Sequence, residues 1–298
     1  MTLPASGPIS FNNINVELGV SGTTQASLGQ SSYRTLAGVA SGQISMSNFY
    51  GKANQFAFTI SSNQTNANLR TLAVNAGWNQ SSKVVATING GIYISSNGTG
   101  TPALTVNGSF PGGVSLVNNG LIIGMGGAGG NGRSSNGSGT NGSAGGLALA
   151  VSVAVSITNS GTIGGGGGGG GGGAFRIASA GKDSDGYAGG GGGGGRSSAA
   201  ANSVPGSGGT ASGFRFNYNG YSGTAGTVSA NGSGGGYNGG GGLGGAGGGW
   251  GAAGSSGGNG SIGYIAVAAT SGGAAGGAVT GNANITWVST GTRLGAIT

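Results

Sequence analysis

The sequence predicts a protein that is mainly β and irregular. We expect a small N-terminal helical module, a β domain, and a layered sandwich of polyglycine-II strands with loop insertions. Three observations predict this. Short helical patterns cluster in the first 53 residues, β-prone apolar runs follow, and glycine then dominates. Eighty of the 298 residues are glycine, with unbroken runs at Gly164 to Gly173 and Gly189 to Gly195.

Glycine blocks leave the chain few physical options. Ordering eighty glycines costs on the order of 100 kcal/mol of backbone entropy, so a disordered linker is one alternative. Collagen is excluded, because there are only five prolines and glycine does not hold every third position. Polyproline-II-type strands have three residues per turn and lateral N–H and C=O groups, so glycine strands can bond to one another. We favour such a bundle over disorder or another β architecture.

Residues 1–53 carry three short helical patterns. Ser10 is placed to cap a helix that stops at Gly19, and a second helix around Tyr33 stops at Gly38. A third runs from Ser45 to Gly51. The apolar residues of these helices make a core too small for much independent stability. We therefore expect this module to dock on another protein.

Residues 54–126 have the pattern of a β-rich linker domain. Phe56 to Ile60, Val84 to Ile88 and Ile92 to Ile94 are β-prone runs, with a turn expected between the last two. Asn66 to Gly77 has helical spacing. Leu147 to Ile157 predicts one buried strand, because it is too short to span a bilayer. The N-terminus has no signal-peptide pattern.

A weak internal repeat precedes the two main glycine blocks. Leu116 to Gly124 and Ser156 to Gly164 each have a strand, an Asn/Gly turn and a second strand that enters glycine. Two copies predict successive coils that feed glycine strands into one stack. We expect the glycine-rich domain to span residues 127–281. Residues 282–298 would then supply a closing strand around Ile285 to Val288.

Insertions interrupt the glycine blocks at Ala174 to Ala188, Arg196 to Pro205 and Phe214 to Ala230. If the glycine strands form a rigid slab, the insertions emerge as loops at its ends. Rigid scaffolds that present aromatic and arginine loops are common in recognition. The alternative is that these side chains cap the glycine stack. The candidate binding residues are Phe175, Arg176, Tyr187, Phe214, Arg215, Phe216, Tyr218, Tyr221, Tyr237 and Trp250.

Composition excludes most catalytic chemistry. Histidine and cysteine are absent, and Glu17, Asp183 and Asp185 are the only acids. Triads, Cys/His zinc sites and opposed catalytic carboxylates therefore lack their residues. Ten scattered cations give a net charge of +7 without the basic patch of a nucleic-acid site. Asp183 to Gly186 matches the start of a calcium loop but lacks its later glutamate. We expect no enzyme, metal or cofactor.

Two resemblances point to one biological setting. Met1 to Ser10, Ile14 to Gly19, Leu36 to Val39 and Ile44 to Lys52 resemble the N-terminal module of tailed-bacteriophage virion proteins, often tail-fibre proteins. The alternation of glycine blocks and insertions also resembles the glycine-rich receptor-binding adhesins at the tips of phage long tail fibres. That resemblance implies layered polyglycine-II strands whose distal loops bind the host surface.

The leading hypothesis is therefore a tail fibre or tip adhesin of a phage virion, assembled in the host cytoplasm. Its partners would be other tail proteins, through the N-terminal module, and a bacterial surface polysaccharide or outer-membrane protein. A homotrimer is one expectation for a fibre, although no heptads support it. We expect neither nucleic-acid binding nor membrane insertion. The alternatives are a purely structural collar, connector or decoration subunit and, from another class, an ice-binding protein.

Overall fold

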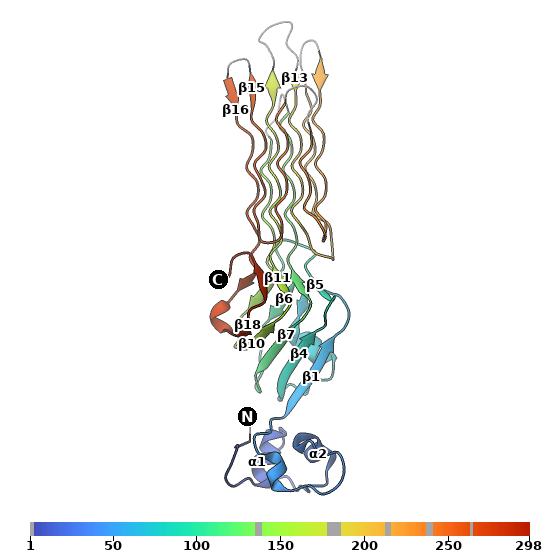
Figure 1. The fold of residues 1–298 in the computed structure, drawn as a ribbon, viewed down its shortest axis with the longest axis vertical. Coiled ribbons are helices and arrows are strands. Elements are labelled where there is room, and N and C mark those ends of the chain that lie inside the picture. Colours follow the sequence, from blue (N-terminus) through green and yellow to red (C-terminus); the bar gives the residue numbers. More distant parts are fainter. Residues whose placement is uncertain (1–2, 135–138, 178–185, 212–215, 237–240, 263–264) are drawn as a thin grey trace.

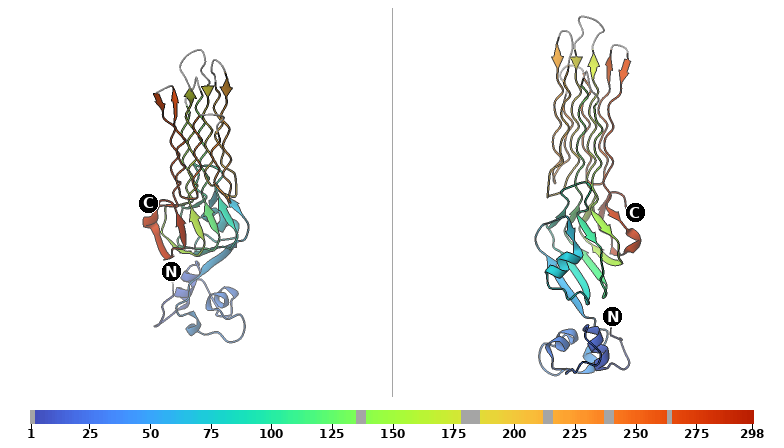
Figure 2. Two further views of the ribbon diagram at one scale, coloured as in Figure 1. Left: turned by 45° about the horizontal axis from the view of Figure 1, so that its top comes forward. Right: turned by 180° about the vertical axis from the view of Figure 1, so that it is seen from behind.

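The computed structural model describes residues 3–134, 139–177, 186–211, 216–236, 241–262 and 265–298. The molecule is elongated, and three parts follow one another along its long axis (Figure 1). A helical part lies at one end, β-sheets lie in the middle, and long glycine-rich segments extend to the opposite end. Both views in Figure 2 show the same order.

The helical part is built from residues 3–53. Helix α1 spans Phe11–Glu17, and the Ser10 hydroxyl oxygen accepts the N–H of Asn13 at 3.3 Å. Helix α2 spans Ser31–Ala37 and ends at Gly38, whose φ of 74° is the left-handed value that glycine adopts without strain. The third expected helix is a short 3-10 helix, η1, at Met46–Phe49.

A small apolar core holds these helices together. Its buried members are Leu3, Ile14, Tyr33, Leu36, Ala37 and Phe49. The Tyr33 hydroxyl donates a hydrogen bond to the side-chain oxygen of Asn15 at 2.5 Å. Burial raises the pKa of Tyr33 above its ordinary value, because the charged form would lose its hydration.

The middle part is a coil of parallel strands with three sides. Each turn of the coil gives one strand to each side, so strands from successive turns pair in register. The first side is β1 Gln55–Ile60, β4 Lys83–Ile88, β7 Val114–Asn118, β10 Val155–Asn159 and β18 Ile285–Ser289. The second is β2 Gln64–Thr65, β5 Tyr93–Ser95, β8 Leu121–Ile123, β11 Thr162–Gly164 and β19 Thr292–Leu294. The third is β3 Ala67–Asn68, β6 Leu104–Val106, β9 Leu149–Val151 and β17 Val279–Thr280.

The interior of the coil is the main hydrophobic core. Alternate residues of each strand point inward, so Ala86, Leu116 and Ile157 stack in register and are fully buried. Helix α3, Leu69–Asn75, begins later than the expected Asn66, because Ala67–Asn68 forms β3 and the Asn68 side chain caps the helix. The 3-10 helix η2, Asn282–Asn284, precedes β18.

Several sequence expectations for this part need correction. The apolar stretch Leu147 to Ile157 contributes to two strands, β9 and β10, on different sides of the coil. The turn after β4 joins two sheets instead of two paired strands. The coil includes residues 149–164 and 279–294 as well as the expected 54–126. Strand pairing between distant segments decides these boundaries, and local pattern does not show it.

The glycine bundle consists of two excursions of the chain out of the coil, within residues 124–146 and 165–276. The chain departs after β8 and returns at β9, then departs after β11 and returns at β17. Within segment 164–174 the hydrogen bonds repeat every three residues. The N–H groups of Gly166, Gly167 and Gly168 donate to three different segments, through Gly146, Arg196 and Ala252, each at 2.9 Å. Gly169 then donates again to the segment that Gly166 contacts.

Two segments lie at the centre of the bundle. Segment 164–174 bonds to six neighbours: 124–133, 140–146, 190–196, 242–248, 252–258 and 270–276. Segment 189–196 also bonds to six: 127–133, 164–173, 206–209, 221–227, 232–235 and 242–248. Six neighbours around one strand make a hexagonal lattice. The two uninterrupted glycine runs of the sequence are therefore its two interior strands.

Position in the lattice explains the glycine pattern. In segment 166–173 a Cβ at any residue would lie within 3.0 Å of a neighbouring backbone atom, closer than real Cβ contacts come. Segment 124–133 has an open side and carries one side chain per three residues, at Met125, Ala128 and Asn131. Segment 220–227 lies at the rim and keeps glycine only at Gly220, Gly223 and Gly226. The Phe214 to Ala230 insertion, expected as a loop, thus contains a lattice strand.

A small sheet closes the end of the bundle farthest from the coil, which we call the tip. Its strands are β12 Arg176–Ile177, β13 Gly186–Tyr187, β14 Asn217–Tyr218, β15 Gly260–Ile262 and β16 Ile265–Val267. They lie in the order β14-β13-β12-β15-β16 (Figure 1). The tip therefore collects segments that are far apart in the sequence.

Candidate functional site

The tip sheet brings three of the candidate residues into one row. Arg176 on β12 pairs with Tyr187 on β13, and Tyr187 pairs with Tyr218 on β14. Side chains of paired residues lie on the same face of a sheet, so this register places a cation beside two tyrosines. The N–H of Ala188 donates to the carbonyl of Tyr218 at 2.9 Å, which fixes β13 against β14.

The aromatic rings of this row are in contact. The rings of Tyr187 and Tyr218 are stacked, with centroids 4.8 Å apart and planes 6° apart. Phe216 lies two residues before Tyr218 on the same side of the chain, and its ring centroid is 6.2 Å from that of Tyr218. The Phe216 side chain is 53% exposed, and Arg176 is exposed. We call Arg176, Tyr187, Phe216 and Tyr218 the tip row.

The tip row presents rigid, flat and amphipathic groups. Tyrosine and phenylalanine bury much area with few rotatable bonds, and the tyrosine hydroxyl can also accept or donate a hydrogen bond at the rim. Arg176 adds a planar cation that suits carboxylates, phosphates and aromatic faces. The row has the chemistry of a binding surface, and it holds no nucleophile–base pair.

The other candidate residues are not all at the tip. Phe175 is only 3% exposed, so it is not part of an exposed contact surface as expected but packs at the end of segment 164–174. Trp250 lies near the coil, where its indole N–H donates to the Ser197 carbonyl at 2.8 Å and Arg196 stacks 3.7 Å from its ring centre. Segment 242–248 runs from the tip back towards the coil, so the chain turns near the coil at Trp250. Tyr221 is 58% exposed on the side of the bundle.

Phe214, Arg215 and Tyr237 lie outside the described residues, as does the Asp183-Ser184-Asp185 motif. Within the described ranges, no group of three or more His, Cys, Asp or Glu side chains could hold a metal ion. No helix among the described residues is long and apolar enough to cross a bilayer.

Sequence reasoning did not select two residues that the fold brings to the tip. Asn217 is exposed on β14 between Phe216 and Tyr218. Arg133 ends segment 124–133, where its carbonyl accepts the N–H of Gly189 at 3.0 Å. In the sequence, Arg133 could have been found from its position at the end of a glycine block, because the end of a block marks an end of the bundle.

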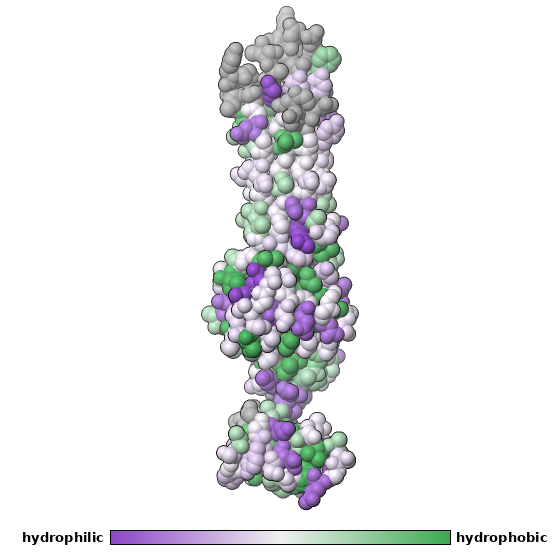
Figure 3. All heavy atoms as spheres, in the orientation of Figure 1, coloured by the Kyte–Doolittle hydropathy of each residue, from purple (hydrophilic) through white to green (hydrophobic). Residues whose placement is uncertain are grey.

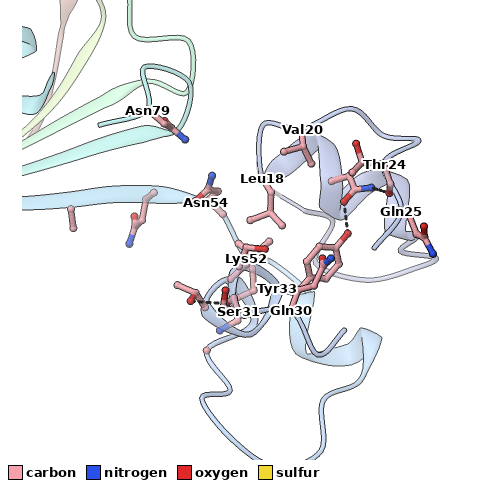
Figure 4. Close-up of a pocket in the computed structure, with 18 residues that line it drawn as sticks. Leu18, Val20, Thr24, Gln25, Gln30, Ser31, Tyr33, Lys52, Asn54 and Asn79 are labelled. Atoms are coloured by element: carbon pink, nitrogen blue, oxygen red, sulfur yellow. Dashed lines mark hydrogen bonds between the residues drawn. The ribbon is translucent and has the colours of Figure 1, made fainter. Parts of the chain in front are cut away.

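A concave feature lies away from the tip, between the helical part and the coil. A groove of about 840 Å³ separates the helical part from the coil (Figure 4). Leu18 and Val20 line it from the helical part, Lys52 and Asn54 from the linker, and Asn79 from the coil. The backbone N–H of Asn54 donates to the Glu17 carboxylate at 2.8 Å, which ties α1 to the start of β1.

Comparisons with known proteins give a family for most of the chain and a similar solved structure. Residues 55–298 match the family model described as phage tail fibre adhesin Gp38. The chain is also similar to a solved structure, the gp37-gp38 adhesin tip complex of the bacteriophage S16 long tail fiber. That similarity has 25% sequence identity and a TM-score of 0.56, and it covers 99% of this chain and 100% of the matched chain. A comparison with curated proteins found no match.

Proposed function

The chain belongs to the phage tail fibre adhesin Gp38 family, and we propose that it binds the bacterial host surface through the tip row and attaches to the rest of the tail fibre through its helical part. The family is one of adhesins, and no catalysis is indicated. The observation that carries the proposal is the gathering of Arg176, Tyr187, Phe216 and Tyr218 on the end farthest from the helical part.

The chemistry of the tip row supports a recognition role. Aromatic and arginine side chains dominate binding energy at protein interfaces, where a few residues carry most of it. The same groups stack on sugar rings, so a surface polysaccharide and an outer-membrane protein both remain receptor classes within this proposal. Phe214, Arg215 and Tyr237 belong to the proposed receptor-binding set from their sequence positions.

We propose that the glycine bundle is a polyglycine-II sandwich that acts as a rigid spacer. The three-residue repeat of its hydrogen bonds supports this, because a polyproline-II-type strand has three residues per turn. At about 3.1 Å per residue, the ten-glycine run would hold the tip about 31 Å away from the coil.

Attachment through residues 1–53 has its own support. Four large apolar side chains of this part are exposed, namely Phe11, Val16, Val20 and Tyr50. The matched solved structure is a complex of two tail-fibre proteins, gp37 and gp38. We propose a tail-fibre protein as the partner here, in a virion assembled in the host cytoplasm. A homotrimer of this chain stays a prediction.

A cell-binding assay with the full chain tests the role of the tip row. Labelled protein carrying Phe216→Ser and Arg176→Gln is compared with wild type on host and non-host bacteria. We expect host-selective binding to fall about tenfold or more, the effect of losing roughly 1.4 kcal/mol at an interface. Both replaced side chains are exposed, so the fold should persist.

The matched control is Val288→Ser, which changes a side chain that is 66% exposed on the coil. This variant should bind cells as wild type does. Unchanged binding by the tip variant, with a wild-type melting curve, would place the receptor site elsewhere. Replacing the whole insertion from Phe214 to Ala230 is a poor test, because it removes lattice segment 220–227.

A further inference from the structure

Nothing in the backbone itself stops the hydrogen-bond lattice of the glycine bundle from continuing beyond its outer strands. Interior segment 164–174 is hydrogen-bonded to six neighbouring segments, whereas segment 242–248 is hydrogen-bonded to fewer neighbouring segments. Its amides at Gly242, Gly245 and Gly248 donate to segment 164–174, and those at Gly244 and Gly247 donate to segment 232–235. Among the described residues, the N–H of Ala246 has no partner. The outer strands therefore keep bonding capacity that interior strands satisfy.

The lattice also accepts neighbours of either direction. Segment 164–174 runs from the coil to the tip, as does segment 124–133, and the two are hydrogen-bonded. Segment 189–196 runs the opposite way and bonds to both. An added strand would thus not need one particular direction to bond.

Where a residue of a lattice segment faces a neighbouring strand, there is no room for a side chain. A Cβ at Gly245 would overlap the Ser255 carbonyl, and one at Gly247 would overlap the Gly194 carbonyl. Outward positions on the same segments do carry a Cβ. Leu243, Ala246 and, on the adjoining segment, Ser233 are all exposed.

Outward glycines with open space are rare on this side of the bundle. Gly249 has no atom within 4 Å of an added Cβ, and Gly236 has only the Tyr221 ring, at 3.6 Å. They lie at opposite ends of the two segments, one near the coil and the other near the tip. Within residues 232–236 and 241–249, Ser233, Leu243 and Ala246 are the residues that interrupt glycine.

We propose that Ser233, Leu243 and Ala246 end the glycine lattice and prevent a second copy of the chain from adding to this face. With glycine at these positions, the face would offer the same contacts as the interior. Two copies would then join face to face through backbone hydrogen bonds. These side chains act as the charged residues of exposed β-sheet edges do, by making edge-to-edge association unfavourable.

The test compares self-association of three full-length proteins by sedimentation over a range of concentrations. One carries Ser233→Gly, Leu243→Gly and Ala246→Gly. The matched control carries Ser233→Ala, Leu243→Ala and Ala246→Ser, which keep the Cβ. We expect the glycine variant to self-associate at least tenfold more tightly than wild type, and the control to match wild type.

A glycine variant that melts cooperatively but sediments as wild type does would overturn the proposal. If the triple variant does not fold, the pair Leu243→Gly and Ala246→Gly takes its place, because it already makes residues 241–249 continuous glycine. Failure of this pair to fold, while the Cβ-keeping control folds, also counts against the proposal. That result would show that the side chains hold the bundle together instead of ending it.

Discussion

Glycine at the bundle interior is required by space and not by backbone angle. An added Cβ at Gly169 would overlap the Ala128 carbonyl, a backbone atom that cannot move aside cheaply. The φ of Gly169 is not among the left-handed values that only glycine adopts easily. Interior glycine is therefore the counterpart of a large apolar side chain in an ordinary core, because both achieve close packing.

The pair Gly169→Ala and Gly249→Ala tests this point directly. We expect Gly169→Ala to lower the free energy of unfolding by roughly 1–3 kcal/mol or more, the cost of overpacking. Gly249→Ala has open space and should be neutral, or stabilising by about 0.4–1 kcal/mol through loss of unfolded-state entropy. Urea unfolding measures both, and equal effects would contradict the packing argument.

Buried asparagines support one corner of the coil. The Asn118 side-chain amide donates to the Asn159 side-chain oxygen at 2.8 Å, and the Asn159 amide donates to the Thr290 carbonyl at 2.7 Å. Both asparagines are essentially inaccessible to solvent. The two buried side chains thus link three successive turns of the coil.

Asn159→Ala should lower the melting temperature clearly. It removes the partner of the buried Asn118 amide, and an unsatisfied buried group costs about 1–3 kcal/mol. Asn97→Ala breaks the similar but exposed pair with Asn66 and should cost less than about 1 kcal/mol, because water replaces the partner. Similar losses for both variants, measured by thermal unfolding, would show that burial does not set the cost.

At the scale of elements, polar residues close the ends of the coil. On its second side, Ile94, Ile122 and Ile163 stack in register between Gln64 of the first turn and Arg293 of the last. The Arg293 guanidinium lies 4.8 Å from the ring centre of Trp287, which extends the apolar stack of the first side. Terminal turns with polar outer positions are typical of capped repeat proteins.

Attachment by the helical part predicts a separation between two activities. Val16→Glu with Val20→Glu places charges on exposed apolar positions and should weaken co-purification with the tail-fibre partner about tenfold or more, while binding to cells persists. Val288→Glu is the control, because it makes the same change on the coil. Loss of cell binding in the first variant, or loss of co-purification in the control, would contradict the division of roles.

At the scale of the whole molecule, charge is sparse and uneven. The net charge of +7 arises from ten cations and three acids, with no histidine. Among the described residues, the lattice segments carry charged side chains only at their ends, as at Arg133 and Arg196. The face of the bundle in Figure 3 is correspondingly pale between the more strongly coloured regions near its two ends.

This charge distribution predicts how binding depends on solution conditions. Binding should stay constant between about pH 6 and 8, because histidine is the side chain that ordinarily changes charge there and the chain has none. The association rate with anionic cells should fall as salt rises from about 0.15 to 1 M, because the screening length shortens from about 8 to 3 Å. Cell-binding kinetics at fixed ionic strength and varied pH check the first point. A pH-dependent rate would contradict it.

Part of this architecture could be predicted from the sequence alone. Ser10 and Gly38 mark helix ends locally, so the helices of the N-terminal part could be placed within a few residues. The repeat at Leu116 to Gly124 and Ser156 to Gly164 indicated successive coils, and β7 pairs with β10 as β8 pairs with β11. Composition could also exclude catalytic classes, because chemistry needs residues that the chain lacks.

Only the tertiary structure decided which segments meet. Local pattern could not show that Leu147 to Ile157 bends between two sheets, that Phe214 to Ala230 contains a lattice strand, or that Trp250 turns near the coil while Tyr187 and Tyr218 stack at the tip. The physical reason is that glycine strands bond through their backbones, which are alike at every residue. The sequence determined where glycine must stand, and the packing of distant segments determined which side chains meet at the tip.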